Sequence, residues 1–348
     1  MENQLSLLLH NISADLFRID LALFRPIIRY PIPATVNIIN LKKKHTIDIL
    51  FIIRLFRLVA SSKYDVIISK ISGVNTYILL VCWLLRKKNC IVEIRNSGDR
   101  QLPAYRVMKL FARFFRFQFT LVTNSKKAAV EARNHLPATI AIFTITNGVD
   151  ISRFKPRPVR KESFHIGYAG RIIPHKNIQL IISAIALFKE QYGNNNITLT
   201  LSGPTNDFQY LKEIKTLISN NNLNHSVFIK PVTDTIERFY NSIDLFILPS
   251  LFEGTPNVLL EAMASGCICL CSKGANSDSF LKDEFIFDEH SPHELCEKIH
   301  HIHTLSVEMR HRIETENREY ICNNHSSIKM VEAHCSLWNK ITSKNVTV

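Results

Sequence analysis

The sequence predicts an α/β protein made of two doubly wound domains, each with a parallel sheet between layers of helices. Short β-branched and aromatic runs alternate with longer segments of helical period along the chain, which is the pattern of βαβ units. The length of 348 residues corresponds to two domains at about 150 residues each. Basic residues are concentrated in the first half, so the two domains differ in charge.

The first half is expected to contain six short strands separated by helical segments. Strand-forming residues cluster at residues 6–9, 36–39, 66–69, 90–94, 119–123 and 142–146. Only two glycines precede residue 148, which leaves few positions for a glycine loop around a phosphate in this half.

The second half is also expected to contain six strands, with helices between most of them. The strands are predicted at His165–Ala169, Ile197–Ser202, Val227–Lys230, Leu245–Leu248, Cys267–Ser272 and Phe285–Phe287. The helices are predicted at Asn177–Glu190, Phe208–Asn221, Thr235–Ser242, Asn257–Ser265 and Pro292–His303. Ligands of such folds bind outside the carboxyl ends of the strands, here expected in the crevice between the domains.

The charge distribution places the domain boundary. Residues 1–158 contain 25 Lys+Arg and 9 Asp+Glu, a net charge of +16, and residues 159–348 contain 18 and 21, a net charge of −3. A Pro- and charge-rich stretch at 154–161 marks a linker. We therefore expect an N-terminal domain at 1–158 and a C-terminal domain at 159–325. A last helix at about 326–345 is expected to pack back on the N-terminal domain.

Several classes of protein are disfavoured by missing patterns. The first residues lack the basic start of a signal peptide. The longest uncharged apolar run, Tyr77 to Leu85, is about half of the ~20 residues that a membrane-spanning helix needs. No C-x-x-C, G-x-G-x-x-G or P-loop pattern is present. We therefore expect a cytoplasmic, thiol-reduced protein that is neither a nicotinamide enzyme nor a P-loop ATPase.

Residues 249–266, PSLFEGTPNVLLEAMASG, are the most informative segment. Thr255 is expected to cap a helix that has Pro256 at its first position, and Gly266 is expected to end it. A helix N-terminus beside Gly254 presents backbone N–H groups and a positive dipole end, which suit a diphosphate.

Two carboxylates, Glu253 and Glu261, lie on either side of this helix start. Each could hold hydroxyl groups, one on a transferred sugar and one on a ribose. On pattern alone, a helix-start charge and a solvated helix residue explain them equally well.

A second segment, Gly167–Asn177, ends a strand and places two cations in a Pro-containing loop. Gly170 allows close approach of the backbone to a ligand. Arg171 offers a planar fork for phosphate oxygens and Lys176 a mobile point charge, and both would stabilise negative charge on a departing diphosphate. Taken alone, two loop cations are more often ordinary solvated residues, and His175 between them is expected at the rim.

Together these residues resemble the retaining nucleotide-sugar glycosyltransferases of family 4. Their GT-B fold consists of two facing Rossmann-like domains with an interdomain cleft. The acidic Glu-x7-Glu pair and the G-R-x4-K element of the family are present as Glu253 and Glu261 and as Gly170, Arg171 and Lys176. Asn177 stands where glycine is usual, and the resemblance is strong from about residue 120 to 282.

The resemblance implies a donor site in the C-terminal domain, with Glu253, Arg171 and Lys176 as the catalytic residues. Glu261 would hold the ribose, and the loop after Val227–Lys230 would flank the base. The implied donor-binding residues are Gly170, Arg171, Lys176, Gly203, Pro231, Val232, Glu253, Gly254, Thr255, Pro256, Asn257 and Glu261. It also implies retention, and transfer without a metal or other cofactor, and no Asp-x-Asp is present.

The N-terminal half departs from the family pattern. His10–Asp15 replaces the Gly-Gly loop of many relatives, and Glu93–Asp99 replaces the segment with a sugar-contacting histidine. This second segment is similar to the Glu-Arg-Asn variant of enzymes that build lipid-linked or surface glycans. Arg95 and Asn96 are therefore expected to face the acceptor or the sugar.

The segment Arg106–Phe117 mixes cations with aromatic residues. With Lys42–Lys44 and Arg86–Lys88 it predicts a basic, aromatic surface of the kind that binds anionic bilayers. No nucleic-acid motif accompanies it, so a nucleic-acid partner is disfavoured. A helix with one core-facing side and solvated cations explains the segment equally well.

The expected function is a metal-independent, retaining hexosyltransferase that uses a nucleotide-sugar, most simply a UDP-sugar. Its acceptor would be a glycan or a polyprenyl-diphosphate-linked glycan of capsule, O-antigen or lipopolysaccharide biosynthesis. The expected location is the cytoplasmic face of the inner membrane, as a peripheral protein. The alternatives are a sugar-nucleotide epimerase or hydrolase on the same scaffold, and a non-catalytic glycosyltransferase-like subunit.

Overall fold

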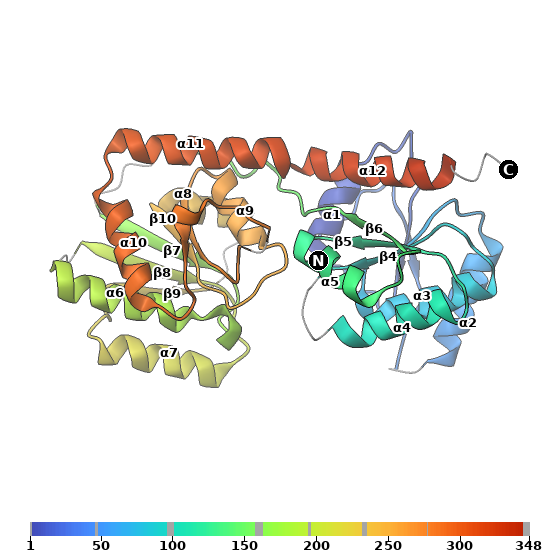
Figure 1. Cartoon of the computed structure of the whole chain (residues 1–348), viewed down its shortest axis with the longest axis horizontal. Helices are drawn as coiled ribbons and strands as arrows, with labels where there is room; N and C mark the ends of the chain where they lie inside the picture. Colours follow the sequence, from blue (N-terminus) through green and yellow to red (C-terminus); the bar gives the residue numbers. More distant parts are fainter. Residues whose placement is uncertain are drawn as a thin grey trace. The chain divides into compact units, whose positions relative to one another are not determined.

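The computed structural model describes residues 2–45, 48–95, 101–156, 163–193, 196–231, 235–276 and 278–343. The chain forms two compact units, one of Met1–Gly148 with Ser327–Val348 and the other of Val149–Ser326 (Figure 1). The division after Gly148 lies before the linker at 154–161 that the sequence indicated. The reason is that Val149 N donates to the carbonyl of His325 (2.8 Å) and Phe154 is buried in the core of the second unit.

The second unit contains a six-stranded parallel sheet in the order β12-β11-β10-β7-β8-β9. Its first strand along the chain, β7, lies between β8 and β10, which is the doubly wound arrangement. The strands are β7 (Phe164–Ala169), β8 (Ile197–Ser202), β9 (Val227–Lys230), β10 (Leu245–Leu248), β11 (Ile268–Ser272) and β12 (Ile286–Phe287). Each overlaps a strand predicted from the sequence.

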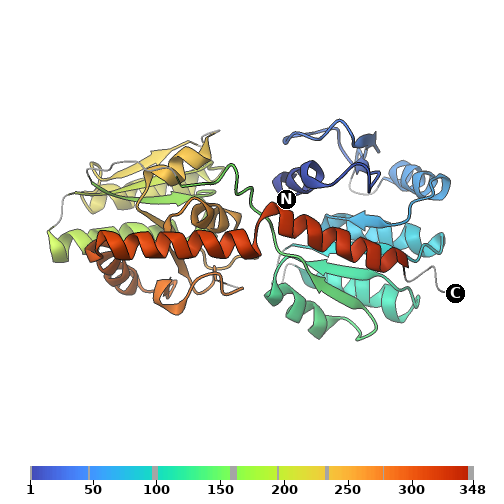
Figure 2. The same ribbon diagram turned by 90° about the horizontal axis from the view of Figure 1, so that it is seen from above.

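Helices cover both faces of this sheet (Figures 1 and 2). On one face α6 packs against α7 and α10, and on the other α9 packs against α8 and α11. Their bounds are α6 (Ile178–Tyr192), α7 (Phe208–Asn220), α8 (Ile236–Ser242), α9 (Asn257–Ala264), α10 (Pro292–Thr304) and α11 (Val307–Asn324).

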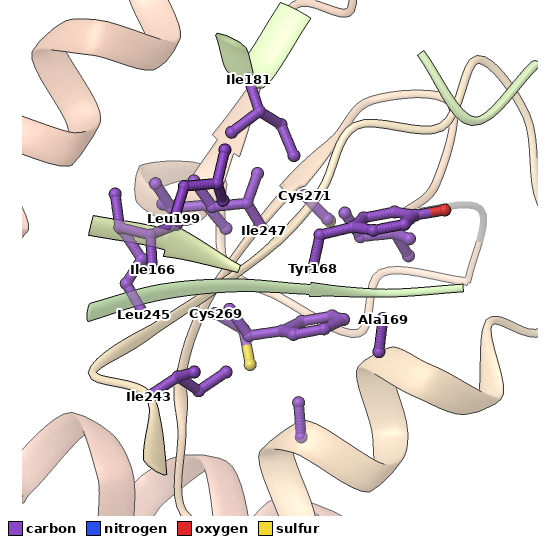
Figure 3. Close-up of a cluster of buried hydrophobic side chains, with 14 of the residues drawn as sticks. Ile166, Tyr168, Ala169, Ile181, Leu199, Ile243, Leu245, Ile247, Cys269 and Cys271 are labelled. Atoms are coloured by element: carbon purple, nitrogen blue, oxygen red, sulfur yellow. The ribbon is translucent and has the colours of Figure 1, made fainter. Parts of the chain in front are cut away.

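The core of the second unit explains why its strands read as continuous apolar runs. Side chains from β7, β8, β10 and β11 are buried on both sides of the sheet (Figure 3). Cys267, Cys269 and Cys271 belong to this core. Burial raises the pKa of the Cys269 and Cys271 thiols, so they behave as small hydrophobic residues.

The first unit contains a four-stranded parallel sheet, β3-β4-β5-β6, and a separate parallel pair, β1-β2. The strands are β1 (Asp20–Leu23), β2 (Asn37–Asn40), β3 (Ile67–Ser69), β4 (Cys90–Ile94), β5 (Thr120–Thr123) and β6 (Ala141–Thr144). The sequence predicted six strands in this half. Six are described, but they form two separate parallel sheets instead of one. The α/β class with parallel sheets is confirmed.

The strand predicted at residues 6–9 is also wrong, because this segment lies in helix α1 (Glu2–Asn11). A short apolar run does not distinguish a buried helix from a strand by its periodicity. Leu8 is buried in a cluster with Val331 and Trp338 of α12 (Ser327–Ser343). Contacts with a segment far along the chain thus stabilise the helix.

Helices α1 and α12 pack against each other and share a cluster with inward side chains of β4 and β5. The other cluster of the sheet includes residues of α2 (Ile49–Ser61), α3 (Ser72–Leu84), α4 (Leu102–Arg113) and α5 (Lys126–His135). Among the described helices of either unit, none combines the length and apolar character needed to cross a bilayer.

Candidate functional site

The predicted donor residues that the structure describes gather at the carboxyl ends of neighbouring strands in the second unit. β7 and β10 are adjacent, although β8 and β9 lie between them in the sequence. Gly170–Lys176 follows β7, and Pro249–Pro256 follows β10. In an open α/β sheet this reversal of strand order is where ligands bind.

Lys176 and Glu253 form an ion pair between these two loops, from Lys176 Nζ to Glu253 Oε1. Their side chains are 12% and 16% exposed. Ser250 Oγ donates to the same carboxylate oxygen over 2.8 Å. The sequence predicted both residues for one site but did not predict their contact, because 77 positions separate them.

The Lys176 loop is held by backbone contacts to the other loop. Leu251 N donates to the carbonyl of His175 (3.0 Å), and the His175 ring stacks on Phe252 with centroids 5.1 Å apart. The stacking places His175 beside the Glu253 loop.

Asn177 ends the short turn Pro174–Lys176 in the left-handed conformation, with φ of 53°. Its Nδ2 donates to the carbonyl of Glu289 over 2.8 Å. Asparagine adopts this conformation more readily than most residues do. Asparagine can therefore occupy this left-handed position, where the family usually has glycine.

Two glycines allow the loops to touch backbone to backbone. A Cβ at Gly203 would lie 1.7 Å from the carbonyl oxygen of Gly170, and a Cβ at Gly274 would lie 2.0 Å from that of Leu251. Such distances exclude any side chain. Gly203 was predicted to lie beside the donor. It is also needed for the loop after β8 to pack against the loop after β7.

Arg171 lies directly after Gly170 and is exposed to solvent. Its carbonyl accepts a hydrogen bond of 2.9 Å from the buried Tyr168 hydroxyl. This contact fixes the backbone of Arg171 to the core of the unit.

Glu261 lies in α9 and is only partly exposed. The Tyr240 hydroxyl donates to its Oε2 over 3.0 Å. Burial raises the pKa of Glu261 to about 7, although the Tyr240 hydrogen bond and the charge of Arg153 both lower it. Neither partner could be predicted from the sequence, since Tyr240 and Arg153 come from other segments of the chain.

The start of α9 differs slightly from the prediction. Pro256 is the N-cap and the helix begins at Asn257, so Thr255 is not its cap. The expected end is confirmed, because Gly266 has a φ of 79°. The segment Gly254–Asn257 thus lies at the N-terminal end of α9, as the diphosphate prediction requires.

The remaining predicted residues are placed as follows. Pro231 follows β9, and its carbonyl accepts from Ser202 Oγ at 3.3 Å. Arg95 follows β4 in the first unit, where it pairs with Glu93 at 3.1 Å. Val232 and Asn96 lie outside the described residues.

Comparisons with known proteins agree with this arrangement. Residues 150–320 match the family model described as "Glycosyl transferases group 1". The capsular polysaccharide biosynthesis glycosyltransferase CapH of Staphylococcus aureus is 24% identical over 259 residues, which are 72% of this chain and 70% of that protein. An Escherichia coli UDP-Gal:alpha-D-GlcNAc-diphosphoundecaprenol alpha-1,3-galactosyltransferase is 24% identical over 68% of this chain and 65% of its own length.

Solved structures match over nearly the whole chain. Anabaena HepE in complex with UDP has a TM-score of 0.80 at 17% identity, covering 97% of this chain and 96% of that one. Sucrose-phosphate synthase from Thermosynechococcus elongatus has a TM-score of 0.78 at 15% identity, covering 98% and 92%.

The fold is therefore that of the GT-B glycosyltransferases, as predicted. The resemblance to the group 1 glycosyltransferases is also confirmed, and it is carried by the second unit, where the family model matches. Together these matches support a glycosyltransferase of glycan biosynthesis.

Proposed function

We propose that this protein is a retaining glycosyltransferase that transfers a sugar from a nucleotide-sugar, with a UDP-sugar as the favoured donor. The observation that carries the proposal is the junction of β7 and β10, where Lys176 of the loop after β7 pairs with Glu253 of the loop after β10. Arg171 lies in the same loop as Lys176. A relative that uses UDP-galactose and a fold neighbour bound to UDP support the choice of donor.

The cations of the β7 loop would bind the donor diphosphate. As the bond between the sugar and the diphosphate breaks, negative charge grows on the departing diphosphate, and Arg171 and Lys176 stabilise it. The N-terminal end of α9 adds its positive dipole end. We infer that these groups act without a divalent metal.

Lys176 also gives Glu253 its position. The ion pair and the Ser250 hydrogen bond both use Oε1 of Glu253. The diphosphate would compete for Lys176, and the carboxylate would then accept hydrogen bonds from hydroxyl groups of the donor sugar. Binding of the diphosphate and of the sugar is therefore coupled through one side-chain pair.

Glu261 would hold the ribose of the donor. Its Oε2 accepts from Tyr240, and the carboxylate would accept a second hydrogen bond from a ribose hydroxyl. Burial favours the protonated form of Glu261 by raising its pKa to about 7. A hydrogen bond from a hydroxyl group favours the ionised form instead.

The acceptor is proposed to be a lipid-linked or surface glycan of capsule, O-antigen or lipopolysaccharide biosynthesis. CapH supports the capsule setting, and the galactosyltransferase relative has a diphosphoundecaprenol acceptor in its name. A lipid-linked acceptor requires the protein to reach a membrane, and the first unit has a suitable surface.

That surface lies on α2 and α4. Large apolar side chains that are 36% to 76% exposed occur on these helices and directly after α4, at Ile49, Leu50, Ile53, Phe56, Leu110 and Phe114. The exposed cations Arg57, Arg106, Lys109, Arg113 and Arg116 are interspersed among them. Apolar side chains among cations are typical of helices that lie in the interface of an anionic bilayer. The opposite side of α4 is buried, so this helix serves the core as well.

A nucleotide-release screen tests the proposal. UDP-, GDP- and ADP-sugars are each supplied with a membrane lipid extract as the source of acceptor, and the released nucleotide and the anomeric configuration of the product are measured. We expect one donor to release its nucleotide only when the extract is present. The product should retain the anomeric configuration of that donor. Release without any extract would instead identify a hydrolase, and donor binding with no release would identify a non-catalytic subunit.

A further inference from the structure

A second charged cluster lies in the first unit, apart from the proposed donor site. Glu93 in β4 is 3% exposed, and each of its carboxylate oxygens faces a cation. Lys70 Nζ lies 2.5 Å from Oε1, and Arg95 Nη2 lies 3.1 Å from Oε2. Lys70 directly follows β3 and Arg95 directly follows β4, so the cluster lies at the carboxyl ends of these parallel strands.

A small cavity adjoins the cluster. It is lined by Glu93, Arg95, Thr123, Thr146, Asn147 and His334, together with apolar neighbours. These residues come from the ends of β4 and β5, from the segment after β6 and from α12. His334 is 3% exposed and is the contribution of the C-terminal helix. Asn124, which also lines the cavity, directly precedes the N-cap Ser125 of α5, so the positive end of that helix lies at the same edge.

The charges of this cluster do not balance. Burial alone would raise the pKa of Glu93, but the charges of Lys70, Arg95 and His334 lower it to about 2. Burial and the charges of Lys70 and Arg95 lower the pKa of His334 to about 3, against the opposing effect of Glu93. Burial lowers the pKa of Lys70, and the charge of Glu93 opposes this effect. With Lys70 and Arg95 both charged, the carboxylate and a neutral imidazole leave a net charge of +1 among these described side chains.

An uncompensated charge in a buried cluster is unfavourable unless a counter-ion completes it. An oxyanion in the cavity would meet Arg95, Thr146 and His334, whose side chains can donate hydrogen bonds. A neutral hydroxyl group in the same place would leave the charge unbalanced.

We propose that this cavity binds a phosphoryl group of the acceptor, with Arg95 and His334 in contact with it and Lys70 completing the positive field. Glu93 is a positioning residue that fixes the two cations. The inference rests on the proposed function only in naming the ligand as the acceptor, because the positive cavity belongs to the first unit alone.

The test uses inorganic pyrophosphate and the full chain, with His334 as a local reporter. The imidazole resonances of His334 are identified by NMR from their loss in His334→Gln. Bound pyrophosphate offsets the charges of Lys70 and Arg95, so the pKa of His334 should rise by at least one unit. Unmoved His334 resonances up to 10 mM pyrophosphate would overturn the proposal. A response confined to His334 cannot arise from binding at the second unit.

Variants check the assignment. Arg95→Gln should weaken the pyrophosphate response of His334 at least tenfold, and Arg95→Lys should retain part of it. Lys63→Gln, at an exposed cation after α2, should leave it unchanged. Equal affinity in Arg95→Gln and the parent protein, with both folded by circular dichroism, contradicts the proposal. Farnesyl diphosphate is the probe for a lipid-linked source of the phosphoryl group, and glucose 1-phosphate is the probe for a soluble source. The stronger response of His334 identifies the source.

The proposed function can fail separately. If no donor releases its nucleotide but pyrophosphate still moves His334, the anion site stands and the glycosyltransferase proposal falls. If turnover proceeds at full rate in Arg95→Gln with an acceptor that carries phosphate, the proposed function stands and the anion site falls.

Discussion

Glu253 and Glu261 come from one short segment, yet their carboxylates meet different surroundings. Glu253 is paired with a cation and a hydroxyl group, through Lys176 and Ser250. Glu261 is held by the Tyr240 hydroxyl in a site whose burial favours the neutral form. These different surroundings are consistent with the two roles proposed above, Glu253 at the donor sugar and Glu261 at the ribose.

The Lys176–Glu253 pair is predicted to control turnover. Lys176→Ala or Glu253→Ala should each lower nucleotide release by about a hundredfold or more, because each removes a group that acts on developing charge or on the sugar. The loss is measured as kcat/KM with the donor and acceptor found by the screen. Lys273→Ala, in an exposed ion pair with Asp288, is the matched control and should retain activity. Full turnover in both site variants would contradict the assignment.

Glu261 is predicted to make the second unit less stable as pH rises. Below pH 4.5 the carboxyl is protonated in both states and has no effect. Between pH 4.5 and about 7 the unfolded chain loses the proton and the folded one keeps it, so the free energy of unfolding falls. Above pH 7 the loss is complete, at most about 3 kcal/mol for this shift.

Glu261→Gln removes this dependence. From pH 5 to pH 8.5, its free energy of unfolding should therefore rise relative to the parent protein by about 1–3 kcal/mol. Urea unfolding at the two pH values measures the difference. Glu319→Gln, on the exposed side of α11, serves as the control. A difference that stays constant with pH would show that Glu261 ionises normally.

At the scale of elements, most helices and strands of the second unit could be predicted from local pattern. β7 and β10 are apolar on both faces, and the polar loops after them end the runs clearly. The prediction of a strand at residues 6–9 is wrong because a short apolar run is compatible with either a strand or a buried helix. Its partner α12 lies at the other end of the sequence and leaves no local trace.

The contact between the loops after β7 and β8 is predicted to require glycine. Gly203→Ala would drive a methyl group into the Gly170 carbonyl, so one loop must move. We expect the second unit to lose about 2 kcal/mol or more of stability and UDP binding to weaken at least tenfold. Thermal unfolding and calorimetric titration measure the two effects. Gly73→Ala in α3 has open space around its Cβ and should be neutral or slightly stabilising.

The α2 and α4 surface is predicted to bind anionic vesicles. Leu110→Ser/Phe114→Ser should reduce co-sedimentation with phosphatidylglycerol vesicles about tenfold, because two apolar side chains leave the bilayer interface. Raising salt from 0.15 to 0.5 M should weaken binding of the parent protein, as the cations are screened. Phe208→Ser removes an equally exposed ring of the second unit and should have no effect. Equal binding to neutral phosphatidylcholine vesicles would contradict the role of the cations.

Across the whole molecule, the proposed function assigns different tasks to the two units. The second unit contains the family match and the proposed donor residues, and the first contains the proposed acceptor cavity and the basic surface. The uneven charge of the sequence is consistent with this division. The net positive charge would serve the membrane and a phosphorylated acceptor, whereas the donor needs only local cations.

Transfer is predicted to be independent of divalent metal. After dialysis against 5 mM EDTA, nucleotide release should remain within twofold of the untreated rate, because Arg171, Lys176 and the α9 dipole supply the positive charge. Restoration of a lost rate by added Mg²⁺ or Mn²⁺ would contradict this. A parallel assay of Lys176→Ala, with and without Mg²⁺, tests whether a metal can replace the missing cation.

Local sequence pattern was enough to predict the α/β class and nearly every element of the second unit, and to propose the residues of the donor site. It could do so because strand and helix periods, turn residues and short motifs are local properties of the chain. Three features emerge only from the packed chain: Lys176 pairs with Glu253, Tyr240 and burial alter the pKa of Glu261, and Glu93, which pairs with Lys70, lines one cavity with Arg95 and His334. These contacts join residues from distant segments, and their charges depend on a burial that exists only after the sheets and helices have packed.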